Sequence, residues 1–119
     1  MTQQAIEANV KELIALVESG KTLDAFDKFY HEDLVMQENH GEERIGKAVN
    51  RKFEEDFLAG IQNVRDYRST GYMAGSGVAS IRWKVDMDHA AWGSVDFTEI
   101  TLQEWRDGQI VRESFHYQF

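Results

Sequence analysis

The chain has 119 residues, a formal net charge of −8 and 42% apolar residues, which favours one domain over residues 1–119 with its own core. The negative charge disfavours nucleic acid and anionic membrane surfaces as partners. The chain has no cysteine, which excludes disulfides and thiolate metal sites, and no window is apolar enough for a membrane span. We therefore expect a cytoplasmic protein.

The N-terminal segment has the periodicity of two helices. Its apolar residues recur at spacings of three and four, which predicts an amphipathic helix ended by Gly20. They are Ile6, Val10, Leu13, Ile14 and Val17. A second helix is expected to start at Thr22, whose hydroxyl can cap it, and to end near His31.

A short strand and a third helix follow. Leu34 to Glu38 reads as a strand, and Glu38 places an acid in an otherwise apolar run. After the loop from Gly41 to Gly46, apolar residues four positions apart predict a helix that ends before Gly60. They are Val49, Phe53 and Phe57.

Beyond residue 60 the apolar period changes to two, which is typical of half-buried strands. Turn-forming residues divide this region into four predicted strands: Asn63–Ala74, Val78–His89, Val95–Trp105 and Ile110–Tyr117. Helices followed by an antiparallel meander indicate an α+β fold, with the three helices packed on one face of a curved, mostly antiparallel sheet.

The last hairpin has two reasonable registers. A two-residue turn at Asp107 and Gly108 pairs Trp105 with Ile110, and Thr101 then shares a face with Ser114 and His116. A three-residue loop from Arg106 to Gly108 pairs Trp105 with Gln109 and aligns Thr101 with Glu113. The choice decides whether Glu113 or His116 faces the core.

The order of elements and three motifs resemble the superfamily of nuclear transport factor 2, ketosteroid isomerase and the SnoaL-like polyketide cyclases. The motifs are Phe29-Tyr30-His31-Glu32-Asp33-Leu34-Val35-Met36, the helix-starting Gly46, and Trp105-Arg106-Asp107-Gly108-Gln109-Ile110-Val111. The resemblance spans nearly the whole chain. It implies a cystatin-like, cone-shaped roll whose curved sheet wraps the helices around an apolar pocket, often with dimerisation through the outer sheet face.

The resemblance also implies a position for the catalytic acid. Glu38 stands where the ketosteroid isomerases have their proton-moving aspartate, and Asn39 replaces the proline that usually follows. Two hydrogen-bond donors of those enzymes are missing, because their positions are occupied by Leu13 and Thr101. Without both donors an enolate loses stabilisation, so steroid isomerisation is not predicted.

The family cone also implies the pocket wall, an aromatic surface with a few polar groups. The expected lining residues are Trp83, Val85, Phe97, Glu99, Thr101, Gln103 and Phe115. Glu113 beside Glu38 would form a carboxylate pair, and Tyr117 would donate to a developing oxyanion. We therefore assign Glu38, Tyr117 and Glu113 as candidate catalytic residues.

Glu38 has two interpretations. In an apolar pocket, burial would raise its pKa toward the range useful for proton transfer. At a solvated strand end it would instead pair with Arg44 or Lys47.

Trp92 also has two interpretations, since it can cover the pocket mouth or a dimer partner, or pack on its own sheet. The four histidines lack a tight ligand motif, so no metal or cofactor is expected.

The leading hypothesis is a SnoaL-like protein that binds an apolar small molecule and uses Glu38 as the general base of an isomerase, cyclase or dehydratase. A second hypothesis is hydrolysis by paired carboxylates, Glu38 with Glu99 or Glu113, as in epoxide hydrolases of the superfamily. The third is a non-catalytic ligand-binding module, or a homodimer whose outer sheet face carries Ile100 and Leu102.

Overall fold

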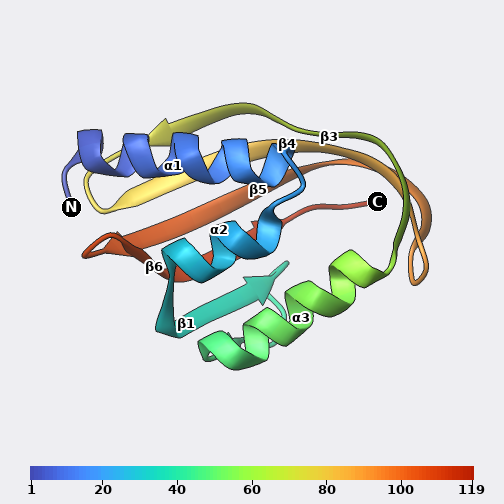
Figure 1. The fold of residues 1–119 in the computed structure, drawn as a ribbon, viewed down its shortest axis with the longest axis horizontal. Coiled ribbons are helices and arrows are strands. Elements are labelled where there is room, and N and C mark those ends of the chain that lie inside the picture. Colours follow the sequence, from blue (N-terminus) through green and yellow to red (C-terminus); the bar gives the residue numbers. More distant parts are fainter.

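The computed structural model describes residues 1–119, with three helices on one face of a six-stranded sheet (Figure 1). The helices are α1 (Gln3–Glu18), α2 (Thr22–Phe29) and α3 (Lys47–Ala59). The strands are β1 (Tyr30–Glu38), β2 (Arg44–Ile45), β3 (Ile61–Ala74), β4 (Val78–His89), β5 (Gly93–Arg106) and β6 (Gln109–His116). The α+β class and the helices on a curved sheet are as predicted. No helix is both long and apolar enough to cross a membrane.

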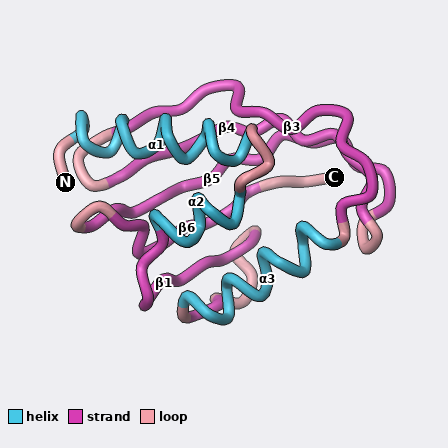
Figure 2. The backbone as a smooth tube through the Cα atoms, in the orientation of Figure 1, coloured by secondary structure: helices cyan, strands magenta, loops and turns pink.

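The sheet order is β2-β1-β6-β5-β4-β3, and only the β1 and β6 pairing is parallel. The long strands β3, β4 and β5 curve together around one end of the molecule (Figure 2). The β4 alternation is as predicted, because Ile81, Trp83, Val85 and Met87 are buried and their neighbours are more accessible. The C-terminal ends of β1 and β6 lie side by side, pairing Glu38 with Phe115.

The helix starts and ends follow local chemistry, with one correction. The Thr2 side chain accepts a hydrogen bond from the Ala5 amide at 3.2 Å and so caps α1, and Gly20 adopts the left-handed conformation predicted for it. The prediction that Thr22 caps α2 is wrong, because Lys21 precedes the helix and provides no side-chain cap. That helix also ends at Phe29, because Tyr30 is already extended and begins β1.

The predicted buried face of α3 is wrong at two of its three positions, whereas Phe57 packs against the core as expected. Val49 is 55% exposed and Phe53 is 40% exposed, whereas Asn50 between them is fully buried. The Asn50 amide donates to the carbonyls of Arg44 and Gly46 at 3.0 and 2.8 Å and accepts from Arg44 Nε at 3.0 Å. Because a buried amide must keep its hydrogen bonds, these contacts turn the Asn50 face of α3 inward.

The last hairpin combines features of both predicted registers. Asp107 and Gly108 form a two-residue turn, both with positive φ, and Trp105 pairs with Ile110. The register then shifts by one residue between Trp105 and Glu104, which pairs with Arg112. This bulge places Gln103 opposite Glu113 and Thr101 opposite Phe115, so Thr101 shares its face with Glu113, as in the second register, and not with Ser114 and His116. The bulge turns the Glu113 side chain into the interior.

Candidate functional site

The interior between the helices and the sheet contains two adjoining pockets. The inner pocket is about 60 Å³ and is lined by α1, α2 and the middle of the sheet, and the outer pocket is about 70 Å³ and is lined by α3 and the strand ends. Four residues line both pockets: Glu54, Tyr67, Glu99 and Phe115. Both volumes are below the several hundred Å³ typical of drug-sized sites, so the interior suits a small ligand or one group of a larger one.

The two pockets contain every site residue expected from the sequence. The inner pocket is lined by Trp83, Thr101, Gln103 and Glu113 among others, and the outer pocket by Glu38, Val85, Phe97 and Tyr117. Glu99 and Phe115 lie between them and line both. Alternation along β4 and β5 explains this grouping, because residues two apart on a strand project from the same face.

Glu38 combines its two predicted positions. It lines the outer pocket at the end of β1, and its carboxylate is also held by both terminal nitrogens of Arg44, with Nη2 to Oε1 at 3.1 Å. The Arg44 guanidinium lies 3.6 Å from the centre of the Phe53 ring, as in a cation–π contact. Arg44, which itself packs on Phe53, therefore fixes the Glu38 carboxylate at the wall of the outer pocket.

Glu113 is held by a buried hydrogen-bond chain. Its carboxylate accepts from the Tyr30 hydroxyl and from the Gln103 amide, each at 2.6 Å. The Gln103 oxygen accepts from Trp105 Nε1 at 3.0 Å, which fixes the orientation of the amide. Burial raises the pKa of Glu113 to about 7, although both donated hydrogen bonds favour the charged form. The chain therefore orients Glu113 rigidly between β1 and β5.

Glu99 and Glu54 differ from Glu113 because no hydrogen bond stabilises their charged forms. Burial, reinforced by the other acids of the pocket, raises the pKa of Glu99 to about 8 and that of Glu54 to about 7. Groups with pKa values near neutral can both donate and accept a proton at physiological pH. The shared wall of the two pockets is therefore suited to proton transfer.

Two hydroxyl groups complete the polar lining. Thr101 is 2% exposed, and its Oγ1 atom is buried without a hydrogen-bond partner. Tyr117 lines the outer pocket, where burial raises the pKa of its hydroxyl to about 12, so this group stays protonated and can donate. Both groups can therefore bind a polar atom of a ligand.

Three titratable lining residues, Glu54, Tyr30 and Tyr67, were missed from the sequence. Glu54 lies four residues after Asn50, so the inward face of α3 carries both, but the sequence analysis took the apolar Val49 and Phe53 as the buried side. Tyr30 and Tyr67 come from the start of β1 and the middle of β3. The signal for Glu54 was its helical spacing from a buried asparagine.

Aromatic side chains pack around Trp92, which lies in the turn between β4 and β5. Trp92 lines the outer pocket and packs against Phe57 and His89, with ring centroids 5.4 and 4.8 Å away. It also contacts Tyr117 and Phe119 near the C-terminus, at 6.1 and 4.9 Å. Of its predicted positions, Trp92 occupies both the pocket wall and its own sheet.

The histidines do not assemble a metal centre. His89 Nε2 lies 2.9 Å from the carbonyl of Phe57, and its Nδ1 accepts from the Ala91 amide at 3.1 Å. His40 and His116 pack at 5.1 Å between centroids, and His116 Nε2 lies 2.9 Å from the hydroxyl of Ser114. No group of three or more His, Cys, Asp or Glu side chains is arranged to hold a metal ion.

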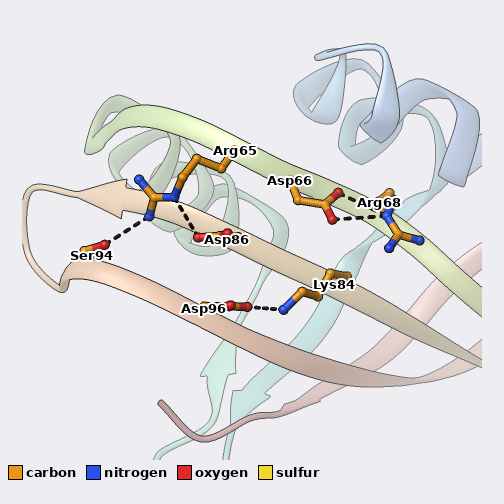
Figure 3. Close-up of polar contacts among 7 residues, drawn as sticks. All are labelled: Arg65, Asp66, Arg68, Lys84, Asp86, Ser94 and Asp96. Carbon is orange, nitrogen blue, oxygen red and sulfur yellow. Dashed lines mark hydrogen bonds and ion pairs between the residues drawn. The ribbon is translucent and has the colours of Figure 1, made fainter.

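The outer face of the sheet has a larger hollow, of about 510 Å³, between the β3–β4 turn and the strands β5 and β6. Its apolar wall includes Met73, Val78 and Leu102, which are 74%, 49% and 48% exposed. Farther along the same face, charged side chains of β3, β4 and β5 form ion pairs, among them Arg65 with Asp86 (Figure 3). The outer face thus has an apolar end and a charged end.

Comparison with known proteins finds a matching protein family and similar solved structures. Residues 10–113 match the profile of the SnoaL-like domain. A Mesorhizobium loti crystal structure described as a SnoaL-like polyketide cyclase is similar, with a TM-score of 0.84 and 22% identity over 94% of this chain and 98% of that one. No curated protein matches the sequence.

Two further solved structures are similar across most of their length. A protein described as an isomerase from Bacillus subtilis has a TM-score of 0.77 and 15% identity over 99% of this chain and 90% of that one. A protein described as a ketosteroid isomerase from Kribbella flavida has a TM-score of 0.76 and 13% identity over 98% and 80%. At these identities the likeness establishes the fold alone.

Proposed function

This chain belongs to the family of SnoaL-like domains, and from that premise we propose that it binds a small carbonyl compound in its interior and moves a proton on it. The reaction class is isomerisation, cyclisation or dehydration. The observation that carries the proposal is the Glu99 carboxyl, which lines both pockets and whose pKa burial raises to about 8. A carboxyl that is neutral at pH 7 can donate a hydrogen bond to a developing oxyanion.

In this proposal Glu38 is the base and Glu99 is the acid. Glu38 and Glu99 line the same outer pocket, and Arg44 holds the Glu38 carboxylate in place. Glu38 removes a proton from the carbon beside the carbonyl while Glu99 hydrogen-bonds the carbonyl oxygen. Glu99 precedes Thr101 by two residues on the same strand face and so supplies the carboxylic acid that Thr101 does not provide.

Tyr117 and Glu113 have supporting roles in the proposal. Tyr117 donates a second hydrogen bond to the oxyanion from the outer pocket. Glu113, held by Tyr30 and Gln103, adds negative charge beside Glu99 and favours the protonated state of that neighbour. The proposed ligand-contacting walls are those of the two pockets.

Hydrogen–deuterium exchange at the α carbon of a simple ketone tests the proposal. With cyclohexanone in heavy water, we expect the protein to accelerate exchange, and Glu38→Gln to lower the rate by about 100-fold. Glu99→Gln lowers it by a similar factor, since removing one oxyanion donor costs on the order of 100-fold. Glu104→Gln is the matched control, because Glu104 is an exposed residue of the same strand.

Exchange no faster than in buffer, or unchanged by Glu38→Gln, contradicts the proposal.

A hydrolytic reaction is the second candidate, because Glu38 and Glu99 line the same pocket and Glu38 is close enough for its charge to help raise the pKa of Glu99. Hydrolysis of a small epoxide by the protein, abolished by Glu38→Gln without any ketone exchange, would favour it.

We also propose that two copies associate in the cytoplasm through the apolar end of the outer sheet face. Met73, Val78 and Leu102 expose apolar surface around the 510 Å³ hollow, and soluble proteins usually cover such patches. Leu102→Glu is expected to convert a dimer to a monomer in sedimentation or light scattering. A monomer at high concentration in the unsubstituted protein contradicts this association.

A further inference from the structure

The charge lining the interior is all of one sign. Four glutamates line the two pockets, Glu38, Glu54, Glu99 and Glu113, and no lysine, arginine or histidine does. Arg44 pairs with Glu38 without lining either pocket, and its charge also favours the ionised form of Glu54. The three glutamates other than Glu38 come from α3, β5 and β6, so three separate elements direct acids toward the same space. We propose that the inner pocket binds an organic ammonium group, so that the ligand is a cationic amine.

The Thr101 hydroxyl is an independent observation at the same place. It is 2% exposed, has no hydrogen-bond partner and lines the inner pocket with Glu99 and Glu113. An unpaired buried hydroxyl costs free energy, so a bound group that pairs with it adds affinity. A hydroxyl oxygen can accept from an N–H group, and its dipole can face a quaternary nitrogen.

Aromatic rings form part of the remaining wall of the inner pocket, beside aliphatic side chains. Phe26 stacks on Tyr30 with centroids 4.6 Å apart, and Tyr67 meets the edge of Trp83 at 6.0 Å. All four rings line the inner pocket. Aromatic faces attract alkylated ammonium groups through their quadrupoles, more strongly where water is excluded. The pocket of about 60 Å³ matches a compact head group rather than a whole large molecule.

The carboxyl groups also determine a measurable consequence of cation binding. Glu99 faces Glu54 and Glu113, Glu113 accepts from Tyr30 and Gln103, and Glu38 with its Arg44 partner lies at the outer end. Tyr67 and Tyr117, from β3 and the C-terminal segment, complete the titratable groups around them. Burial holds part of this cluster protonated at neutral pH, because the pKa of Glu99 is about 8.

A cation replaces those protons. Its charge favours the carboxylate form, so protons leave the cluster for solvent when the ligand enters. A neutral ligand leaves the protons in place, and an anion draws additional ones in. The direction of proton transfer on binding therefore distinguishes the three ligand charges.

Calorimetric titration with choline and its neutral isostere 3,3-dimethylbutan-1-ol tests the proposal. At pH 7.5 we expect choline to bind and to release protons, seen as binding heats that differ between phosphate and Tris buffers. We expect the neutral isostere to bind at least about 10-fold more weakly, a difference of about 1.4 kcal/mol. Glu99→Gln weakens choline binding by about the same factor, whereas Glu104→Gln leaves it unchanged. Thermal unfolding checks that both variants fold.

Three results overturn the proposal: no choline binding at millimolar concentration, equal binding of the neutral isostere, or binding without proton release. The inference goes beyond the proposed function, because a bound cation favours the ionised form of Glu99, whereas the proposed reaction needs that carboxyl protonated. Choline itself has no carbonyl and undergoes no proton transfer. If choline binds and cyclohexanone does not exchange, the proposed reaction fails and the ligand class stands. Exchange without choline binding gives the reverse conclusion.

Discussion

Acidic side chains have opposite surroundings on the two faces of the sheet. On the outer face, Arg65 donates to Asp86 at 2.8 Å and Lys84 pairs with Asp96 (Figure 3). Arg65 also donates to Asp88 at 2.9 Å. On the inner face, no basic residue lines the pockets beside the carboxyl groups of Glu99 and Glu113, and α3 adds Glu54 from the opposite wall. Strand alternation separates the outer from the inner acids within the sheet, because Asp96 and Glu99 belong to one strand.

The pKa values move in opposite directions as a result. Hydrogen bonds from Arg65 and Ser94 hold the pKa of Asp88 below its usual range, whereas burial raises the pKa of Glu99 to about 8. Asp88 is therefore charged at neutral pH. The pKa values of Glu54, Glu99 and Glu113 lie near neutral pH, so these carboxyl groups are partly protonated there. Their burial costs stability, and their readiness to exchange protons is useful for catalysis.

Removing the support of an inner acid has the largest expected effect on stability. Gln103→Leu leaves the Trp105 Nε1–H without its acceptor and takes one donor from Glu113, both in the buried interior. Because each unsatisfied buried group costs about 1–3 kcal/mol, we expect a loss of about 2–4 kcal/mol in urea unfolding. Glu104→Gln, the next residue and on the outer face, should change stability by less than about 0.5 kcal/mol.

The pH dependence of stability sharpens the comparison. Folding raises the pKa of Glu99 from its usual 4.5 to about 8, so the folded state binds the proton more tightly than the unfolded chain. The stability that this proton provides is therefore present below about pH 4.5 and lost as the pH rises through 8. Glu99→Gln should match the unsubstituted protein at pH 5 and exceed it by about 1–3 kcal/mol at pH 8.5. Equal stabilities at both pH values would contradict the account.

Breaking an outer ion pair has the smallest expected effect. Lys84→Ala leaves Asp96 solvated, so we expect a loss below about 1 kcal/mol that shrinks further in high salt. Arg65→Ala is the stricter case, because Arg65 also donates to the Ser94 hydroxyl at 3.0 Å. A loss of several kcal/mol from either substitution in urea unfolding would remove the distinction between the faces.

Strand periodicity predicted the sheet, whereas the pocket-facing residues were expected from the family resemblance. Thr101 and Gln103 are buried and alternate with exposed Leu102, so they lie on the side of the sheet that the resemblance implied. Apolar periodicity predicted the wrong orientation of α3 at Val49 and Phe53, because the buried hydrogen bonds of Asn50 outweigh the apolar surface of these two residues. Hydrophobic periodicity does not register a buried polar anchor, and Glu54 was missed with it.

The hairpin shows a second limit. The turn at Asp107 and Gly108 follows from local chemistry, but the register shift beyond Trp105 depends on how β6 meets both β5 and β1. A bulge adds a residue without a sequence signal in this strand. The Arg44 pairing with Glu38 likewise depends on the loop that brings β2 beside β1. Such contacts are set by the assembled fold.

Titration of the side-chain carboxyl carbons by ¹³C NMR tests the central claim most directly, since each glutamate reports its own protonation. The account predicts signals of Glu54 and Glu113 with midpoints near pH 7 and of Glu99 near pH 8, the last absent in Glu99→Gln. It also predicts that Asp88 titrates below its usual range. If every glutamate titrated near the ordinary value of 4.5, the inner face would hold no desolvated acids and the account would be contradicted.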